Sequence, residues 1–125
     1  DLEQNQVVVV RRDTGEKMMV PQDHVLERIE ELLEDIQKNL YSKALEFRDA
    51  NTFTEDDYTR FQERIEDPGG FFWVHWCGSP DCETDFQYKS KATIRCVPMD
   101  GEKETGTCIV CGQPSEQRVL VAKAY

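Results

Sequence analysis

Basic residues are scarce in this sequence, and long hydrophobic runs are missing. Of its 125 residues, 15 are lysine or arginine and 25 are aspartate or glutamate, which gives a formal net charge of −10. Such an excess of acid disfavours a general nucleic-acid-binding surface. The excess lies in the middle of the chain, where residues 21–51 and residues 52–70 each carry a net charge of −4. We interpret these charges as solvated helix faces that promote solubility.

Targeting and membrane-spanning segments are also missing. No apolar stretch approaches the roughly 18 residues of a membrane span, and there is no signal peptide. The odd number of cysteines, five, together with the missing signal favours a reduced, cytoplasmic protein without a membrane partner. The chain starts at Asp1 and opens on a strand-like run. We therefore expect it to be a fragment of a longer protein.

The motifs of several common enzyme classes do not occur. The sequence has no phosphate-binding loop, no zinc-protease helix and no defensible Ser/His/Asp arrangement. We therefore expect the isolated chain to have no catalytic activity.

What the chain does contain is two close pairs of cysteines. Cys77 and Cys82 are followed, after 25 residues, by Cys108 and Cys111. Pairs at these spacings predict a tetrahedral thiolate site for Zn²⁺. Four thiolates leave no open position for water or substrate, so such a zinc ion would be structural. Two disulfides remain the alternative, which a reducing compartment disfavours.

Residues around the cysteine pairs support the same interpretation. Gly78 and Gly112 each follow a cysteine, where the turn of a metal knuckle often needs a positive φ. Cys82 is predicted to begin a short helix that runs to about residue 91, whose dipole would favour a thiolate. We interpret His75 as a partly buried neighbour of the site and Cys96 as a small core residue, although either could compete as a ligand.

The remaining patterns predict a mixed α and β fold. A β-branched run and a turn cluster predict a hairpin over residues 6–20. Apolar residues at steps of three and four predict one long helix from Pro21 to about Ala50. Thr54 is the expected N-cap of a second helix that ends near residue 66. Strands are predicted over residues 71–76, 93–97 and 117–122. The fold class is therefore α+β with a small mixed sheet, preceded by a hairpin and a long helix.

Taken together, these residues resemble the C-terminal part of the prolyl-tRNA synthetases of the type shared by archaea, eukaryotes and some bacteria. The resemblance covers essentially the whole chain in order. Its matching segments are residues 10–17 (VRRDTGEK), 34–41 (EDIQKNLY), 75–78 (HWCG), 92–98 (ATIRCVP), 108–112 (CIVCG) and 121–125 (VAKAY).

The resemblance implies a class II synthetase that activates proline with ATP and esterifies it to tRNA(Pro). It implies that residues 1–20 end the anticodon-binding domain, that residues 21–51 form a connecting helix, and that residues 52–125 are a two-layer zinc-binding domain. The catalytic core, with its ATP and Mg²⁺ sites, would lie upstream. The full-length protein would be a homodimer in which this part contacts its own catalytic domain.

The resemblance also assigns roles to single residues. The zinc ligands of the family correspond to the four paired cysteines. Its terminal tyrosine, whose carboxylate reaches toward the active site, corresponds to Tyr125. Arg11, Arg12 and Lys17 fall where the anticodon domain ends, and they are candidates for tRNA contacts. Basic residues that flank a hairpin turn are otherwise simply solvated.

Two other functional classes remain open at this point. A free-standing zinc-knuckle module could use its acidic helix to recruit a protein. A thiol redox protein could instead cycle Cys108 and Cys111 between the reduced and oxidised states, unless zinc occupies all four thiolates.

Overall fold

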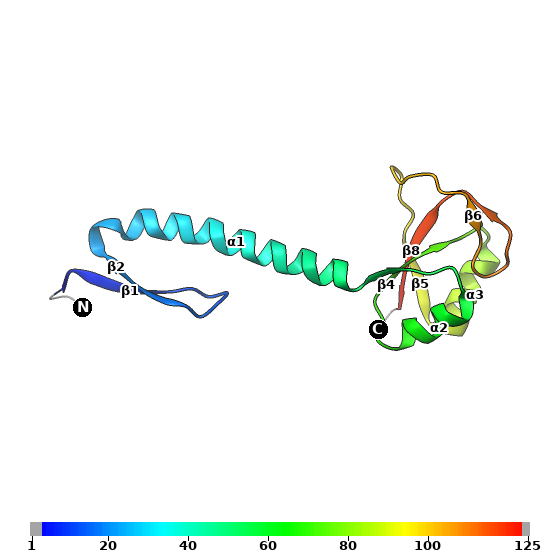
Figure 1. Ribbon diagram of the computed structural model, residues 1–125, viewed down its shortest axis with the longest axis horizontal. Helices are drawn as coiled ribbons and strands as arrows, with labels where there is room; N and C mark the ends of the chain where they lie inside the picture. Colours follow the sequence, from blue (N-terminus) through cyan, green and yellow to red (C-terminus); the bar gives the residue numbers. More distant parts are fainter. Residues whose placement is uncertain (1–3, 124–125) are drawn as a thin grey trace. The chain divides into compact units, whose positions relative to one another are not determined.

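The computed structural model describes residues 4–123, and the chain divides into two compact units, Asp1–Asp49 and Ala50–Tyr125. Figure 1 shows the elements of each unit in sequence order. Among the described residues, no helix combines the length and the apolar character that crossing a membrane requires.

The first unit is a β-hairpin followed by a long helix. Strand β1 (Gln6–Val10) pairs antiparallel with β2 (Lys17–Pro21), as the sequence predicts. A short 3₁₀ turn (Gln22–His24) then leads into helix α1 (Val25–Ala50). The predicted start of the helix at Pro21 is wrong, because Pro21 pairs with Gln6 as the last residue of β2.

Few side chains of the first unit are buried. Among the described residues of this unit, the buried ones are Leu32 on α1 and Val20 on β2, each 5 % exposed. Many other apolar side chains of this unit remain exposed: Val8, Val10, Met19, Leu26, Ile29, Leu33, Leu40 and Tyr41. The apolar stripe that predicts the helix is therefore only partly covered within the described residues.

The second unit contains a four-stranded mixed sheet in the order β3-β4-β8-β5. Strand β3 (Thr52–Thr54) runs parallel to β4 (Phe71–His75). Strand β8 (Arg118–Lys123) lies between β4 and β5 (Ala92–Cys96) and is antiparallel to both. A small ribbon of β6 (Gly106–Thr107) and β7 (Pro114–Ser115) is added near the cysteines.

Two helices, α2 (Tyr58–Glu66) and α3 (Pro80–Ser90), pack on the sheet and complete a two-layer α+β domain. The core between the layers is built from aromatic and β-branched side chains. Phe61 of α2, Phe72 of β4 and Phe86 of α3 are completely buried, and their rings meet edge to face. The predicted fold class, with a small mixed sheet after a hairpin and a long helix, is confirmed.

The start of α2 differs from the prediction. Asp57, rather than Thr54, is the N-cap, and its carboxylate accepts a hydrogen bond of 2.7 Å from the backbone N–H of Arg60. Thr54 instead ends β3, a strand that the sequence pattern did not reveal.

Candidate metal centre

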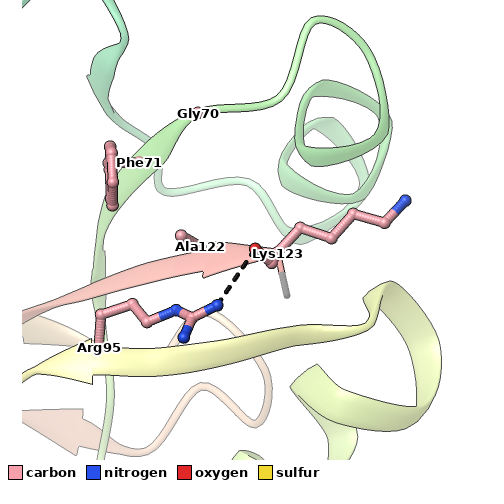
Figure 2. Close-up of a pocket in the computed structure, with 5 residues that line it drawn as sticks. All are labelled: Gly70, Phe71, Arg95, Ala122 and Lys123. Atoms are coloured by element: carbon pink, nitrogen blue, oxygen red, sulfur yellow. Dashed lines mark hydrogen bonds between the residues drawn. The ribbon is translucent and has the colours of Figure 1, made fainter. Parts of the chain in front are cut away.

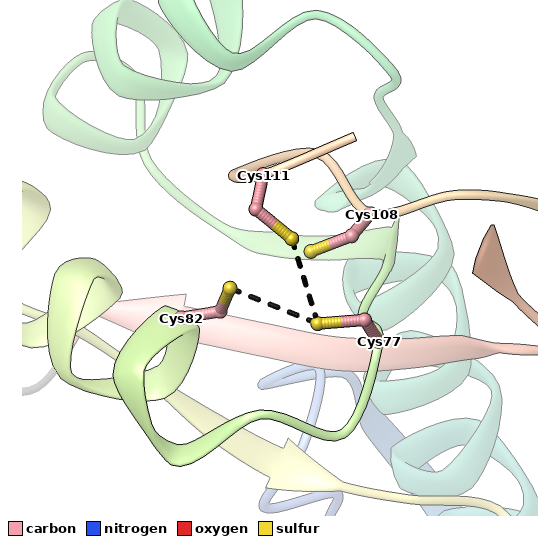
Figure 3. Close-up of side chains that lie close together, drawn as sticks. All are labelled: Cys77, Cys82, Cys108 and Cys111. Carbon is pink, nitrogen blue, oxygen red and sulfur yellow. Dashed lines mark hydrogen bonds between the residues drawn. The ribbon is translucent and has the colours of Figure 1, made fainter. Parts of the chain in front are cut away.

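Three different elements of the second unit bring the four paired cysteines together (Figure 3). Cys77 lies two residues after the end of β4, and Cys82 lies in the first turn of α3. Ser79 caps this helix by accepting a hydrogen bond of 3.3 Å from the backbone N–H of Asp81. Pro80 occupies the first turn, where its missing N–H costs nothing. The predicted helix is thus confirmed and begins two residues before Cys82.

The second cysteine pair lies in the turn between β6 and β7. The backbone N–H of Cys108 donates to the carbonyl of Gln113 at 2.7 Å, and that of Gly112 donates to the carbonyl of Cys108 at 2.8 Å. Gly112 has a φ of +72° and Gly78 one of +86°, as expected for the residue after a knuckle cysteine. The N–H of Ile109 donates to the carbonyl of His75 at 3.0 Å, which ties this turn to the end of β4.

The geometry of the four sulfurs fits a tetrahedral metal ion. All four Sγ atoms lie within 4.8 Å of one another. Cys77 Sγ is 3.7 Å from Cys82 Sγ and 3.6 Å from Cys111 Sγ. Zinc–sulfur bonds of about 2.3 Å in a tetrahedron would separate the sulfurs by about 3.8 Å. All five cysteines are free thiols, so the sulfurs of the cluster are not paired in the two disulfides of the alternative interpretation.

Burial is uneven around the sulfur cluster. Cys82 and Cys108 are buried, with exposures of 5 % and 2 %, whereas Cys77 is half-buried and Cys111 is exposed. A metal ion held here would lie at the surface of the domain with its inner side against the core.

The thiols of the cluster differ in acidity. Burial raises the pKa of Cys77 and of Cys82 above the ordinary thiol value, and the neighbouring cysteines raise that of Cys82 further. Burial also acts on Cys108, but hydrogen bonds from the backbone N–H groups of Cys111, Val110 and Cys77 outweigh it and lower its pKa to about 7. The position of Cys82 at the start of α3 does not compensate for its burial, so a bound cation would be needed to make it a thiolate.

His75 lies beside the sulfur cluster, as the sequence predicts, but it is buried rather than partly buried. Its side chain is 5 % exposed, and its Nδ1 lies 3.1 Å from Ser115 Oγ. The Ser115 hydroxyl already donates its hydrogen to the carbonyl of Gln117 at 2.9 Å, so Nδ1 of His75 is the donor to Ser115. The Nε2 atom faces Glu104 at 3.6 Å. His75 thus links β4 to Ser115 of β7 and to Glu104 in the loop before β6. The sulfur cluster is made of cysteines alone.

Cys96 does not belong to the core, and this prediction is wrong. Its side chain is exposed, because the register of β5 shifts between Ile94 and Cys96. Ile94 pairs with Val121, but Cys96 pairs with Leu120, which turns Cys96 away from the face that carries Ile94.

The predicted tRNA contacts lie in the first unit and differ in their surroundings. Arg11 donates to the carboxylates of Asp13 and Asp35, and only 11 % of its side chain is exposed. These partners hold the pKa of Arg11 above its ordinary value and that of Asp13 below its own. Arg12 and Lys17 are exposed. Sequence reasoning missed the role of Asp13, which also accepts a hydrogen bond from Asn39 of α1 and so fixes the hairpin turn.

Tyr125 lies outside the described residues, which end at Lys123.

The fold and the sulfur cluster define a small α+β domain with a four-cysteine centre suited to a metal. A family model described as "Prolyl-tRNA synthetase, C-terminal" matches residues 58–125. The chain belongs to this family, as its resemblance predicts.

Individual relatives extend the likeness over the whole chain. The chain is 49% identical over 125 residues to a proline–tRNA ligase of Cytophaga hutchinsonii and 48% identical to one of Porphyromonas gingivalis. It covers 26% and 25% of these two proteins, and thus spans about a quarter of the curated relatives it matches. These comparisons do not support a free-standing interaction module.

A solved structure of similar fold is the prolyl-tRNA synthetase of Cryptosporidium parvum complexed with L-proline and AMP. It aligns with all of this chain at 25% sequence identity and a TM-score of 0.89, and the match covers 27% of that protein.

Proposed function

We propose that this chain is the C-terminal part of a proline–tRNA ligase, which activates proline with ATP and esterifies it to tRNA(Pro). The observation that carries the proposal is the sequence identity to proline–tRNA ligases, which is 49% and 48% over the whole length of this chain. The converging cysteines lie inside the segment that matches the C-terminal family model.

The four cysteines would hold Zn²⁺ as a structural ion. Thiolates at this spacing are the usual ligands of closed zinc sites, and four of them complete the coordination. Bound zinc would join the segment after β4, the start of α3 and the β6–β7 turn, none of which has a large core of its own. ATP and Mg²⁺ would bind in the catalytic core upstream. A closed centre with all four thiolates engaged also argues against a thiol redox function.

The first unit would be the end of the anticodon-binding domain and its connecting helix. Its exposed apolar side chains, among them Val8, Val10 and Leu33, support a further part of the full-length protein that covers them. The division into residues 1–20, 21–51 and 52–125 belongs to this proposal. We further propose that the full-length enzyme is a homodimer in the cytoplasm and that this chain contacts the catalytic domain of that enzyme.

Contacts to tRNA(Pro) would come from Arg12 and Lys17, which are exposed beside the hairpin turn. Arg11 would act differently, because its two carboxylate partners already occupy its guanidinium group. It would shape the turn that presents the other two side chains.

The C-terminal residue, Tyr125, would be directed at the active site of the full-length enzyme. A terminal carboxylate offers two acceptor oxygens and a fixed negative charge, and tyrosine adds a ring and a hydroxyl group. These groups could order a loop or a substrate there.

Aminoacylation by the protein of the complete reading frame tests the proposal. We expect it to esterify [¹⁴C]proline to tRNA(Pro) in the presence of ATP and Mg²⁺, and we expect the isolated 125-residue chain to do so no faster than a mock purification. A full-length protein that charges no proline would refute the proposed function.

A further inference from the structure

The turn between β1 and β2 is closed by main-chain hydrogen bonds. The N–H of Arg11 donates to the carbonyl oxygen of Glu16 at 2.8 Å, and the N–H of Gly15 donates to the carbonyl oxygen of Arg11 at 2.9 Å. Gly15 has a φ of +75°, a conformation that residues with a side chain rarely adopt. These bonds give the turn a defined main-chain shape, but they join it only to itself.

Asp13 ties this turn to helix α1. Its side chain is 2 % exposed, and its two oxygens accept hydrogen bonds from Nε and Nη2 of Arg11 at 3.1 and 2.9 Å. One of these oxygens also accepts from the side-chain amide of Asn39, and Nη1 of Arg11 donates to Asp35. Asp35 and Asn39 are four residues apart in α1 and therefore lie on one face of the helix. These four side chains form a polar anchor between hairpin and helix.

The polar anchor has no surplus positive charge to offer a ligand. It combines one guanidinium group with two carboxylates, and only 11 % of the Arg11 side chain is exposed. Breaking the anchor on one side would leave a nearly buried charge without its partner, which costs more free energy than the loss of an exposed ion pair. The anchor therefore holds the turn against α1 and is unsuited to binding an anion itself.

Two exposed cations flank the anchored turn. Arg12 lies in the turn itself, and Lys17 is the first residue of β2. Along β2, the half-buried Met18 and the buried Val20 point to opposite faces of the strand from their neighbours, and Lys17 shares the face that is exposed. Neither Arg12 nor Lys17 forms an ion pair with a carboxylate within the part of the chain that the structure describes. Both are therefore available to the phosphates and base edges of an RNA.

We propose that Asp13 is a positioning residue for tRNA(Pro), which places Arg12 and Lys17 by fixing the hairpin turn to Asn39 of α1. The inference rests on the proposed contacts of Arg12 and Lys17 with tRNA(Pro). Contacts to the RNA backbone set the register and orientation of a protein on its ligand, which requires that the contacting cations have fixed positions. Asp13 itself touches no RNA and acts through the two cations.

The polar anchor is tested first on the 125-residue chain, without RNA. The isosteric D13N variant should raise the amide hydrogen-exchange rates of Arg11 and Gly15, measured by NMR, roughly two- to tenfold, the effect expected of one lost hydrogen bond. The matched control is E31Q, which breaks the exposed ion pair of Arg28 and Glu31 on α1 and should leave both rates unchanged. Equal rates in D13N and E31Q would overturn the inference.

Binding of transcribed tRNA(Pro) by the full-length enzyme separates positioning from simple electrostatics. Removal of an acidic charge beside an RNA site should by itself tighten binding, because RNA is an anion. If Asp13 positions the two cations, D13N should instead raise Kd about three- to tenfold at constant salt. N39A, which changes no charge and leaves the pair of Arg11 and Asp13 intact, should also raise Kd, whereas E31Q should not. Unchanged or tighter binding by D13N would contradict a positioning role.

A coupled experiment checks that Asp13 acts through the two cations. In an R12A/K17A enzyme, D13N should cause no further loss of affinity for tRNA(Pro), because both changes remove the same contacts. Proline-dependent ATP–pyrophosphate exchange, which needs no tRNA, should keep the parent rate in D13N and N39A. An equal loss of affinity in both backgrounds, or slower exchange, would contradict the inference.

Failure of the proposed tRNA contacts gives a different result. If R12A/K17A alone leaves the affinity for tRNA(Pro) unchanged, those contacts are wrong and Asp13 has nothing to position. If R12A/K17A weakens binding but D13N and N39A do not, the contacts stand and the inference about Asp13 fails.

Discussion

Cys108 has the lowest exposure, 2 %, of the four clustered cysteines, and it is the one whose pKa is lowered, to about 7. The C108S variant should therefore lose bound zinc almost completely and destabilise residues 50–125, because metal binding is coupled to folding. The matched control is C96S, which changes an exposed thiol outside the cluster and should shift stability by less than about 0.5 kcal/mol.

Metal analysis of both variants, purified without added zinc, with thermal unfolding alongside, checks this prediction. A C108S protein that keeps one zinc ion per chain, or a folded metal-free parent chain with disulfides, would rule out the proposed centre.

The acidity of the thiols predicts how zinc binding depends on pH. Without metal, the raised pKa values of Cys77 and Cys82 keep both thiols protonated at neutral pH. Zinc must displace these protons, so its apparent affinity rises with pH. Two such thiols predict a drop of at least about 100-fold for each pH unit below 7. Competition with a chelator of known pH dependence measures this effect. A pH-independent affinity between pH 6 and 8 would contradict thiolate ligation.

Residue types were easier to predict from the sequence than residue environments. The four cysteines lie in local turns whose spacing already limits how the sulfurs can converge. Cys96 was misjudged because alternation places it in step with Ile94, and only the register shift at Arg95 reverses that. Such a shift depends on pairing with β8, which is distant in sequence. The hydrogen bond of 3.2 Å that Arg95 Nη2 donates to the Lys123 carbonyl (Figure 2) was missed for the same reason.

At the scale of elements, the ribbon of β6 and β7 depends on a close approach at Gly106. A Cβ atom there would lie 2.2 Å from Nε2 of His75, which is buried. The G106A variant should therefore lower the stability of the second unit by about 1–3 kcal/mol, the usual cost of overpacking.

Thermal unfolding of the zinc-loaded protein checks this prediction, and the control is the same change in a H75A background. Without the imidazole ring, G106A should cost much less, because the two changes are coupled. An equal cost in both backgrounds would show that His75 is not the obstacle.

Element boundaries followed from tertiary pairing more than from local signals. Pro21 is typical of a first helical turn, yet it closes the hairpin because Gln6 pairs with it. Thr54 has the side chain of an N-cap, yet it belongs to β3, and Asp57 caps α2 instead. The three residues of β3 carry little local signal, because their partner β4 lies beyond a whole helix. The long helix α1, by contrast, was predictable from its own periodicity.

At the scale of the whole molecule, the two units should respond differently to loss of metal. All four clustered cysteines lie in the second unit, between β4 and β7. Removal of zinc by a chelator should increase hydrogen exchange in β4, α3 and β8 far more than in the hairpin of β1 and β2. Mass spectrometry of exchanged peptides measures this difference. An equal increase in both units would mean that the metal stabilises the chain as a whole.

The central claim is that this chain is the C-terminal, non-catalytic part of a proline–tRNA ligase. The most direct test is proline-dependent ATP–pyrophosphate exchange and charging of tRNA(Pro), measured for the protein of the complete reading frame, for that protein truncated before residue 1, and for the 125-residue chain alone. We predict exchange and charging by the complete protein, reduced charging by the truncated one, and neither activity in the isolated chain. A complete protein without proline-dependent exchange and charging, or an isolated chain that catalyses exchange, would contradict the claim.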